Sequence, residues 1–307
     1  MSASFASALH AARDAAAGQH YPQGALYVVA TPIGNLADIS LRALYVLQLA
    51  DCIACEDTRH TQSMLRAYGI DKAGDRLLAL HQHNEAQAAQ AVVERLQAGQ
   101  RVAYVSDAGT PGVSDPGARL AAAVQSAGLR CIPLPGASSV TSALSVAGAV
   151  AHQGESNGFV FAGFLPTKSA ERSAAVQRLA GEPRCVVLLE APHRIQELAH
   201  ALAMLGERRV TLARELSKQF EEITTHAAKD IGAWLQGSPQ RIKGEFVVLL
   251  HPAPAPQDDG AAAERVLRLL LAELPTKTAV KLAAEITNAP RNALYERALQ
   301  MKRNDEA

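Results

Sequence analysis

The sequence predicts an α/β protein: two α/β domains with a ligand cleft between them, and a small helical extension at the C-terminus. Three observations lead to this prediction. Short apolar runs alternate with amphipathic stretches from Ala25 onward, a second alternating series follows the Gly154–Gly158 segment, and only helical patterns follow the proline-rich segment that starts at His251. Strands that alternate with helices are typical of a parallel sheet covered by helices.

The composition limits the classes of protein to which the chain can belong. Its 307 residues are 48% hydrophobic and 20% charged, which provides apolar material for two cores and gives no reason to expect global disorder. Thirty Lys and Arg residues balance thirty Asp and Glu residues, so any nucleic-acid contact must come from a local basic patch, and a histone-like role is excluded. Only 4% of the residues are aromatic, which argues against a dense stacking platform for single-stranded nucleic acid.

The cysteine count and the apolar stretches bear on the compartment. Four cysteines are too few for a disulfide framework and indicate a reducing, cytoplasmic environment. The longest stretch without Asp, Glu, Lys or Arg, Cys131 to Gly154, is interrupted by Pro and Gly, so we expect no membrane segment. The N-terminus contains Arg13 and Asp14 and lacks the apolar core of a secretory signal, which predicts a loose tail over residues 1–24.

The first α/β domain is expected at residues 25–150. Apolar runs bounded by turn residues predict strands at Ala25 to Ala30, Cys52 to Glu56, Leu77 to Leu80, Arg101 to Ser106 and Arg130 to Leu134. Apolar residues at helical spacing predict helices at Ile39 to Ala50, Thr58 to Tyr68, Glu85 to Ala98, Gly117 to Ala127 and Ser138 to Gly148.

The second α/β domain is expected at residues 159–251, after a hinge at residues 150–158. Its predicted strands are Phe159 to Phe164, Cys185 to Glu190, Arg209 to Arg214 and Glu245 to His251, and its predicted helices are Ser169 to Leu179, Arg194 to Leu205 and Lys229 to Leu235. A hinge between two such domains leaves a cleft, which is a common place for a ligand pocket.

Prolines and acidic turn residues make residues 252–260 a linker, and a helical extension is expected at residues 261–303. Helices are predicted at Ala261 to Glu273, Thr278 to Thr287 and Pro290 to Met301, with Asn288 in a turn. Residues 276–303 contain six basic and two acidic residues, which makes this the most plausible nucleic-acid contact. A solvated pair of packing or dimerisation helices is an equally weighted alternative.

Three loops at the carboxyl ends of predicted strands are the candidate ligand loops, since ligands bind at that edge of such sheets. The longest, Val105 to Gly117, contains three glycines and two prolines, which fix a tight path and let a ligand approach the backbone. Its Asp107 and Asp115 either bind a ligand or stabilise turns, and the turn is the favoured reading. The loops Ala30 to Asp38 and Pro135 to Ser139 are expected to converge on the same site, the latter with free helix N–H groups that suit a carboxylate.

The sequence does not support several common nucleotide, redox or metal sites. The chain has neither the P-loop pattern nor the Gly-x-Gly-x-x-Gly pattern, which argues against nucleotide hydrolysis and standard dinucleotide binding. Cys52 and Cys55 have redox-pair spacing but no helix N-terminus beside them, so they are expected to be structural. His81, His83 and Glu85 suggest a metal site only weakly, because a helix start explains the same polarity. We expect no metal.

Eight segments together resemble a known family: Leu26-Tyr-Val-Val-Ala-Thr-Pro-Ile-Gly-Asn-Leu-Ala-Asp-Ile, Glu56-Asp-Thr-Arg-His-Thr, Val105-Ser-Asp-Ala-Gly-Thr-Pro-Gly, Pro135-Gly-Ala-Ser-Ser, Phe161-Ala-Gly-Phe-Leu-Pro, Glu190-Ala-Pro-His-Arg, Ala213-Arg-Glu-Leu-Ser-Lys and Lys243-Gly-Glu-Phe. They resemble the ribosomal RNA small subunit methyltransferase I family, the 2′-O-ribose-methylating branch of the tetrapyrrole methylase superfamily.

The resemblance implies transfer of a methyl group from S-adenosylmethionine to the ribose 2′-hydroxyl of a cytidine in the decoding region of small-subunit rRNA. It also implies a homodimer that acts on the rRNA or on the small ribosomal subunit, a cofactor cleft between two α/β domains, and a helix-turn-helix-like C-terminal extension. A tetrapyrrole methyltransferase on the same scaffold and a non-enzymatic RNA-binding module are the rival readings.

By position, the resemblance places these residues at the cofactor: Pro32, Ile33, Asp107, Ala108, Gly109, Gly112, Ser138, Ser139, Leu189, Ala213 and Gly244. Small residues suit a site where a cofactor meets main chain. One departure stands out: the tetrapyrrole enzymes' Gly-Asp-Pro loop is Ala108-Gly109-Thr110 here, so no Asp side-chain role transfers to that point.

Methyl transfer to a hydroxyl requires alignment of the reactants and a group that accepts the hydroxyl proton. The candidate bases are Glu56, Asp57, His83, Glu85, Glu190, Glu215 and Lys218, for each of which a structural ion pair is the simpler reading; we select Glu85. Arg59 is our candidate phosphate anchor. The full set of expected RNA contacts is Arg59, Arg194, Lys218, Lys277, Lys281 and Arg291, and Arg214 is an alternative ion-pair partner.

Overall fold

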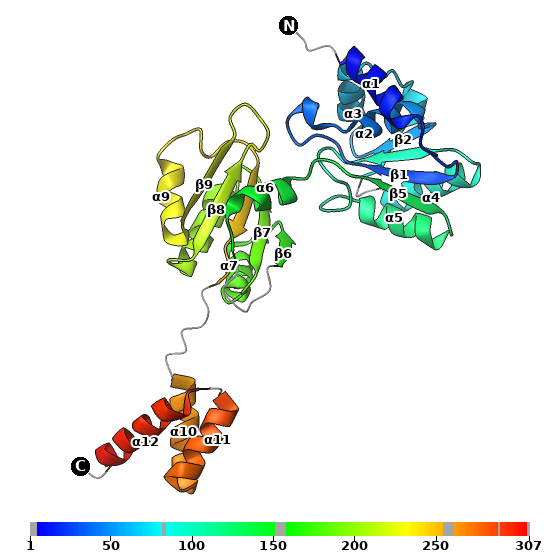
Figure 1. The fold of residues 1–307 in the computed structure, drawn as a ribbon. Coiled ribbons are helices and arrows are strands. Elements are labelled where there is room, and N and C mark those ends of the chain that lie inside the picture. The colour runs from blue at the N-terminus through cyan, green and yellow to red at the C-terminus, as the bar shows by residue number, and fades with distance from the viewer. Residues whose placement is uncertain (1–4, 82–83, 151–157, 254–260, 288, 306–307) are drawn as a thin grey trace. The chain divides into compact units, whose positions relative to one another are not determined.

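The structure is a computed structural model that describes residues 5–81, 84–150, 158–253, 261–287 and 289–305 (Figure 1). The chain divides into two compact units, Met1–Ala253 and Pro254–Ala307. The first unit contains both sheets, and the predicted division of this unit into residues 25–150 and 159–251 stays a prediction. Most of the predicted hinge and linker, His83 and Asn288 lie outside the described residues.

The first sheet has the strand order β3-β2-β4-β1-β5, and all its pairings are parallel. Its strands are β1 (Ala25–Val29), β2 (Cys52–Cys55), β3 (Leu77–Ala79), β4 (Val102–Val105) and β5 (Arg130–Leu134). The helices between them are α2 (Leu41–Leu49), α3 (Thr58–Ala67), α4 (Glu85–Gln97) and α5 (Gly117–Ser126), and α6 (Ser139–Ala147) follows β5. These elements confirm the predicted alternation.

Each face of this sheet has its own core, because successive side chains along a strand point to opposite faces. Tyr27 and Val29 of β1 pack in one cluster, whereas Leu26 packs with Tyr104 and Val92 in the other. The central strands are buried on both faces, which explains why their sequences are continuous apolar runs.

The N-terminus differs from the predicted loose tail. Ala6–Ala16 form helix α1, whose Ala12 is fully buried in the first core with Leu9 and Phe5 packed against it. The Phe5 and Tyr68 rings meet edge to face, with their centroids 5.1 Å apart. In a short stretch rich in Ala, the periodicity of large apolar residues that predicts a helix is weak. Packing against α2 supplies the stability that an isolated helix of this length lacks.

The second sheet has the order β6-β7-β10-β8-β9 and is mixed, since only β6 and β7 pair in parallel. Its strands are β6 (Phe159–Gly163), β7 (Cys185–Glu190), β8 (Arg209–Arg214), β9 (Glu222–Ala227) and β10 (Phe246–Leu250). Its helices are α7 (Ser169–Leu179), α8 (Ile195–Leu202) and α9 (Ile231–Gln236), and α6 contributes Val140, Ala143 and Ala147 to a cluster on its other face.

Strand β9 was not predicted. Its sequence, Glu-Ile-Thr-Thr-His-Ala, has a single large apolar residue, and the strand lies at the sheet edge, where polar side chains are tolerated. The antiparallel pairing with β8, from Arg209 opposite Ala227 to Arg214 opposite Glu222, stabilises it. Only tertiary context makes this segment a strand.

The second unit is a three-helix bundle of α10 (Ala261–Glu273), α11 (Thr276–Thr287) and α12 (Arg291–Asp305) (Figure 1). Leu267, Val280 and Leu294 share its core. Arg297 binds both carboxylate oxygens of Glu264 at 2.9 and 3.0 Å, which joins α12 to α10. Within the described ranges of the whole chain, no helix combines the length and the apolar character needed to cross a bilayer.

Candidate functional site

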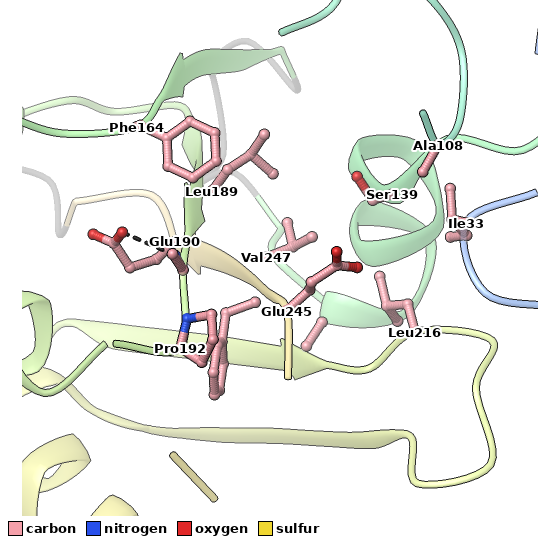
Figure 2. A pocket seen from close by; sticks show the side chains of 13 residues that line it. Ile33, Ala108, Ser139, Phe164, Leu189, Glu190, Pro192, Leu216, Glu245 and Val247 are labelled. Carbon is pink, nitrogen blue, oxygen red and sulfur yellow. Dashed lines mark hydrogen bonds between the residues drawn. The ribbon is translucent and has the colours of Figure 1, made fainter. Parts of the chain in front are cut away.

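A cavity of about 340 Å³ in the first unit lies where loops and strand ends of both sheets meet (Figure 2). The first sheet and α6 contribute three lining residues, and β7, β8, β10 and the adjoining loops contribute the rest. The lining consists of Ile33, Ala108, Ser139, Phe164, Leu189, Glu190, Ala191, Pro192, Ala213, Leu216, Glu245, Phe246 and Val247. Its size and its mainly apolar wall are typical of a small-molecule site.

The three predicted ligand loops meet at one edge of this cavity. Thr31 and Gly109 exchange two backbone hydrogen bonds, of 2.9 and 3.1 Å, which join the loop after β1 to the loop after β4. Thr110 Oγ1 donates to the carbonyl of Ala137 at 2.9 Å, which adds the loop before α6. Gly136 lies so close to Ala30 that an added Cβ would come within 2.8 Å of the Ala30 Cβ. The expected convergence is confirmed.

Asp115 holds the glycine-rich loop in shape. Its Oδ2 accepts from the N–H of Gly112 at 2.7 Å, and its Oδ1 accepts from the N–H of Gly117 at 2.8 Å and from the Tyr104 hydroxyl at 3.0 Å. Burial raises the pKa of Tyr104, and the Asp115 charge adds to this effect, so Tyr104 remains a donor. The structure therefore confirms the turn reading for Asp115.

Asp107 joins the loops after β2 and β4. Its N–H donates to Glu56 Oε1 at 3.0 Å, and its Oδ1 accepts from the N–H of Asp57 at 3.3 Å. Asp57 in turn caps α3 by accepting from the N–H of Arg59 at 2.8 Å, and the N–H groups of Arg59 and His60 lower its pKa. Burial raises the pKa of Glu56. The carboxylates of Glu56, Asp57 and Asp107 thus accept hydrogen bonds from backbone N–H groups of the neighbouring loops or of α3.

Helix α6 begins at the cavity, because Ser139 is both its first residue and a lining residue. The preceding Ser138 makes no side-chain capping hydrogen bond to the helix. The first-turn N–H groups therefore remain available to an anionic group such as a ligand carboxylate.

Glu190 lines the cavity through its main chain. Figure 2 shows its carboxylate on the side away from Ser139 and Ile33. Its side chain is completely buried, with Oε1 3.1 Å from Arg194 Nε and 2.9 Å from the N–H of Ala191. Burial raises its pKa. Glu190 and Arg194 thus form an internal ion pair, which Arg194 extends to the carbonyl of Leu165.

Glu215, Lys218 and Gly244 form a cluster with Glu245, which lines the cavity. Lys218 Nζ donates to Glu215 Oε1 at 2.8 Å and to Glu245 Oε2 at 3.0 Å, and the N–H of Glu245 donates to Glu215 Oε1 at 2.9 Å. Burial opposes the charge of Lys218, but the two carboxylates outweigh this and raise its pKa. Gly244 has φ +88° and faces Glu215, so no side chain fits there.

Five predicted cofactor residues line the cavity: Ile33, Ala108, Ser139, Leu189 and Ala213. The other six flank it in sequence or in the loops just described: Pro32, Asp107, Gly109, Gly112, Ser138 and Gly244. Their roles at a cofactor stay a prediction. Sequence reasoning missed Phe164, Leu216 and Glu245, although all three stand in segments that carried the resemblance.

The predicted base lies elsewhere. Glu85 opens α4, lines a separate surface hollow, and binds Arg119 with its Oε2 2.6 Å from Arg119 Nη1. It does not line the cavity, so the structure offers no support for it as the base. No local pattern predicts this ion pair, because Arg119 lies on α5 and Glu85 on α4.

The predicted RNA contacts fall into four groups. Arg59 is almost fully exposed and makes a loose 3.7 Å contact to Asp57, whereas Lys218 is bound by two carboxylates. Arg194 is unsuited to phosphate binding because it is buried in its ion pair with Glu190. The expected contacts of the second unit, Lys277, Lys281 and Arg291, are all exposed.

The cysteines behave as predicted. All four are free, and Cys52, Cys55 and Cys185 are buried. Burial raises the pKa of both the Cys55 and the Cys185 thiols to about 11, so they remain protonated and unreactive.

Comparison with known proteins gives a consistent result. A family model described as Tetrapyrrole (Corrin/Porphyrin) Methylases matches residues 25–232, and one described as the RsmI C-terminal HTH domain matches residues 257–302. The ribosomal RNA small subunit methyltransferase I of Escherichia coli O157:H7 is 47% identical over 283 residues, which cover 91% of this chain and 96% of the relative. The protein of the same name from Neisseria meningitidis serogroup B is 46% identical over 282 residues, with coverage of 91% and 94%.

Solved structures share the fold at lower identity. The uroporphyrin-III-C-methyltransferase from Thermus thermophilus matches 75% of this chain and 96% of its own, with a TM-score of 0.51 and 22% identity. A diphthine synthase matches 74% and 90%, with a TM-score of 0.53 and 16% identity.

Proposed function

Because the chain belongs to the ribosomal RNA small subunit methyltransferase I family of tetrapyrrole methylases, we propose that it transfers a methyl group from S-adenosylmethionine to the rRNA of the small ribosomal subunit. The observation that carries this conclusion is the cavity in which the three predicted loops meet the second sheet. The acceptor, from the resemblance, is the ribose 2′-hydroxyl of a cytidine in the decoding region.

The cavity fits the chemistry of the cofactor. S-adenosylmethionine has a net positive charge, because it contains a sulfonium and an ammonium group but only one carboxylate. Among the described lining residues none is basic, and the acidic side chain that is not buried in an internal ion pair is that of Glu245. Glu245 has a side chain that is 75% exposed, and Figure 2 shows its carboxylate toward the side of Ser139 and Leu216. Such a wall favours a net cationic ligand.

The residues of the cavity hold and orient the reactants. The bound cofactor supplies an electrophilic methyl group whose leaving group is neutral. Ala108 and the first turn of α6 present main-chain groups, Ala213 and Val247 give a dry wall, and Glu245 complements the positive charge. Much of the rate in such a displacement comes from alignment of the hydroxyl with the methyl group. Burial of the cofactor in an apolar wall also excludes competing water.

Partners and compartment follow from this function. We infer a homodimer, which is supported by the family resemblance and by exposed apolar side chains of the first unit, Phe220 at 68% and Val146 at 54%. We infer a cytoplasmic location, because small ribosomal subunits are the substrate. The second unit, with Lys277, Lys281 and Arg291 exposed, supplies further RNA contacts in this proposal.

The test is radiolabelled methyl transfer from S-adenosylmethionine to small subunits that lack the modification, followed by nuclease mapping. Label in a 2′-O-methylcytidine is expected. Ala108→Arg places a cation in the exposed part of the cavity wall and should abolish transfer and cofactor binding, whereas Ala174→Arg on α7, also exposed, should change neither. Cofactor binding without transfer to rRNA would favour the tetrapyrrole-type alternative.

A further inference from the structure

A groove of about 970 Å³ adjoins the cavity and shares two of its loops. In the loop after β1, Ile33 lines the cavity and the next residues, Gly34–Leu36, line the groove. In the loop after β8, Leu216 lines the cavity and Ser217–Gln219 line the groove. Residues adjacent in sequence thus face two neighbouring sites.

The two sites differ in the charge that they expose. The described lining of the groove contains Arg66 and Lys218, the latter paired with Glu215 and Glu245, whereas the cavity exposes the carboxylate of Glu245. Arg66 is exposed in the last turn of α3, and no ion pair or side-chain hydrogen bond engages it within the described parts of the chain. Arg66 therefore gives the groove a positive charge that no carboxylate of the described residues offsets, which attracts an anion.

The contact between the two loops is rigid. An added Cβ at Gly34 would lie 2.4 Å from Lys218 Cγ and 3.0 Å from the carbonyl of Leu216, so only glycine permits this approach. Glu215 and Ser217 have φ of +52° and +63°, which is a strained conformation for residues with side chains. The Ser217 Oγ is buried and has no hydrogen-bond partner in the described parts of the chain. Strain of this kind persists where the surroundings fix a functional loop.

Lys218 connects the groove with the cavity. It lines the groove, and its Nζ binds Glu245, which lines the cavity. An ammonium group has three N–H donors, and the contacts to Glu215 and Glu245 use two of them. The third donor remains for an anion in the groove.

The neighbouring hollow on the other side of Ile33 and Leu216 does not suit a polyanion. Its lining contains Asp38 and Glu221 and no Lys or Arg. Of these two surfaces beside the cavity, charge favours the groove.

We propose that this groove binds the target segment of the RNA strand, with its phosphates at Arg66 and Lys218, so that a ribose hydroxyl is presented to the adjoining cavity. This inference rests on the proposed function and names the substrate site for it. Phosphate contacts of this kind set the register of a nucleic acid on a protein. Asn35 and Gln219 supply amides at the groove wall for the base or sugar.

The experiment measures the affinity of the full-length protein for small ribosomal subunits that lack the modification, across a range of salt concentrations. Arg66→Ala should weaken binding and reduce the slope of log K against log salt by about 0.7–1, as expected for the loss of one phosphate contact. Gln219→Glu, which puts a negative charge in the groove, should also weaken binding. Arg178→Ala and Gln177→Glu, at exposed positions of α7, are the matched controls. Affinity for S-adenosylmethionine, measured by calorimetry, should be unchanged in all four variants.

The proposal is overturned if Arg66→Ala and Gln219→Glu bind subunits as their controls do, or if their weaker binding is accompanied by an equal loss of cofactor affinity. Because affinity is measured without turnover, this outcome is distinct from failure of the proposed function. That failure would appear as wild-type protein that binds subunits and transfers no methyl group to their rRNA.

Discussion

Gly244→Ala is the substitution whose cost the structure determines most directly. The residue has φ +88°, and an added Cβ would lie 2.4 Å from Glu215 Cγ and 2.6 Å from Glu215 Oε1. The left-handed conformation costs a non-glycine residue about 1–2 kcal/mol. Displacement of Glu215 also removes its charged hydrogen bonds to Lys218 and to the N–H of Glu245, which contribute about 1.5–3 kcal/mol. We expect the free energy of unfolding to fall by about 2.5–5 kcal/mol.

The assay is urea unfolding followed by the fluorescence of Trp234, which is the sole tryptophan of the chain and lies on α9 in the first unit. Two glycines that have nothing within 4 Å of an added Cβ separate the two contributions. Gly128→Ala, with φ +71°, should lose only the 1–2 kcal/mol of backbone strain, and Gly181→Ala, without a positive φ, should lose neither. If Gly244→Ala lowers the free energy of unfolding no more than Gly128→Ala does, Glu215 does not pack closely enough against Gly244 to exclude a Cβ.

Three further predictions concern charge. His251 is buried, with Nε2 2.8 Å from Thr211 Oγ1, and burial together with Arg209 and Arg208 lowers its pKa from 6.5 to about 4. Between about pH 4 and 6.5 the unfolded chain therefore binds more protons than the folded chain, so the free energy of unfolding falls as the pH drops below 6.5. In urea unfolding, His251→Gln should reduce this loss of stability at pH 5 by about 2 kcal/mol. A pH dependence identical to that of the wild type would contradict this prediction. Glu245→Gln should weaken S-adenosylmethionine binding by about two- to five-fold in calorimetry, because an exposed charge pair contributes about 0.5–1 kcal/mol. Tighter binding would show that the Glu245 carboxylate does not attract the cofactor. Glu85→Gln should retain methyl transfer and cofactor affinity, and a large loss of turnover alone would restore it as the base.

Local pattern was sufficient for most of the fold and for the loops that meet at the cavity. Continuous apolar runs such as Cys52–Cys55 and Val102–Val105 are buried on both faces of a parallel sheet, and no other environment suits them as well. Glycines and prolines at the ends of such strands predicted the ligand loops, because ligands bind at that edge. The same reasoning missed β9 and α1, whose own sequences are ambiguous and whose partners, β8 and α2, lie elsewhere in the chain.

The sequence by itself determined the order of the strands and helices other than α1 and β9, the three loops that converge and the family to which the chain belongs, since these depend on neighbouring residues and on motifs. Only the tertiary structure decided which charges are free. Arg194 and Glu190 look like site residues in the sequence but neutralise each other in the interior, and Glu85 is bound by Arg119. Arg66, in contrast, lines the groove with Lys218 and has no ion pair among the residues that the structure describes. The physical reason is that a charge acts according to its neighbours in space, and those neighbours come from other elements that no local pattern identifies.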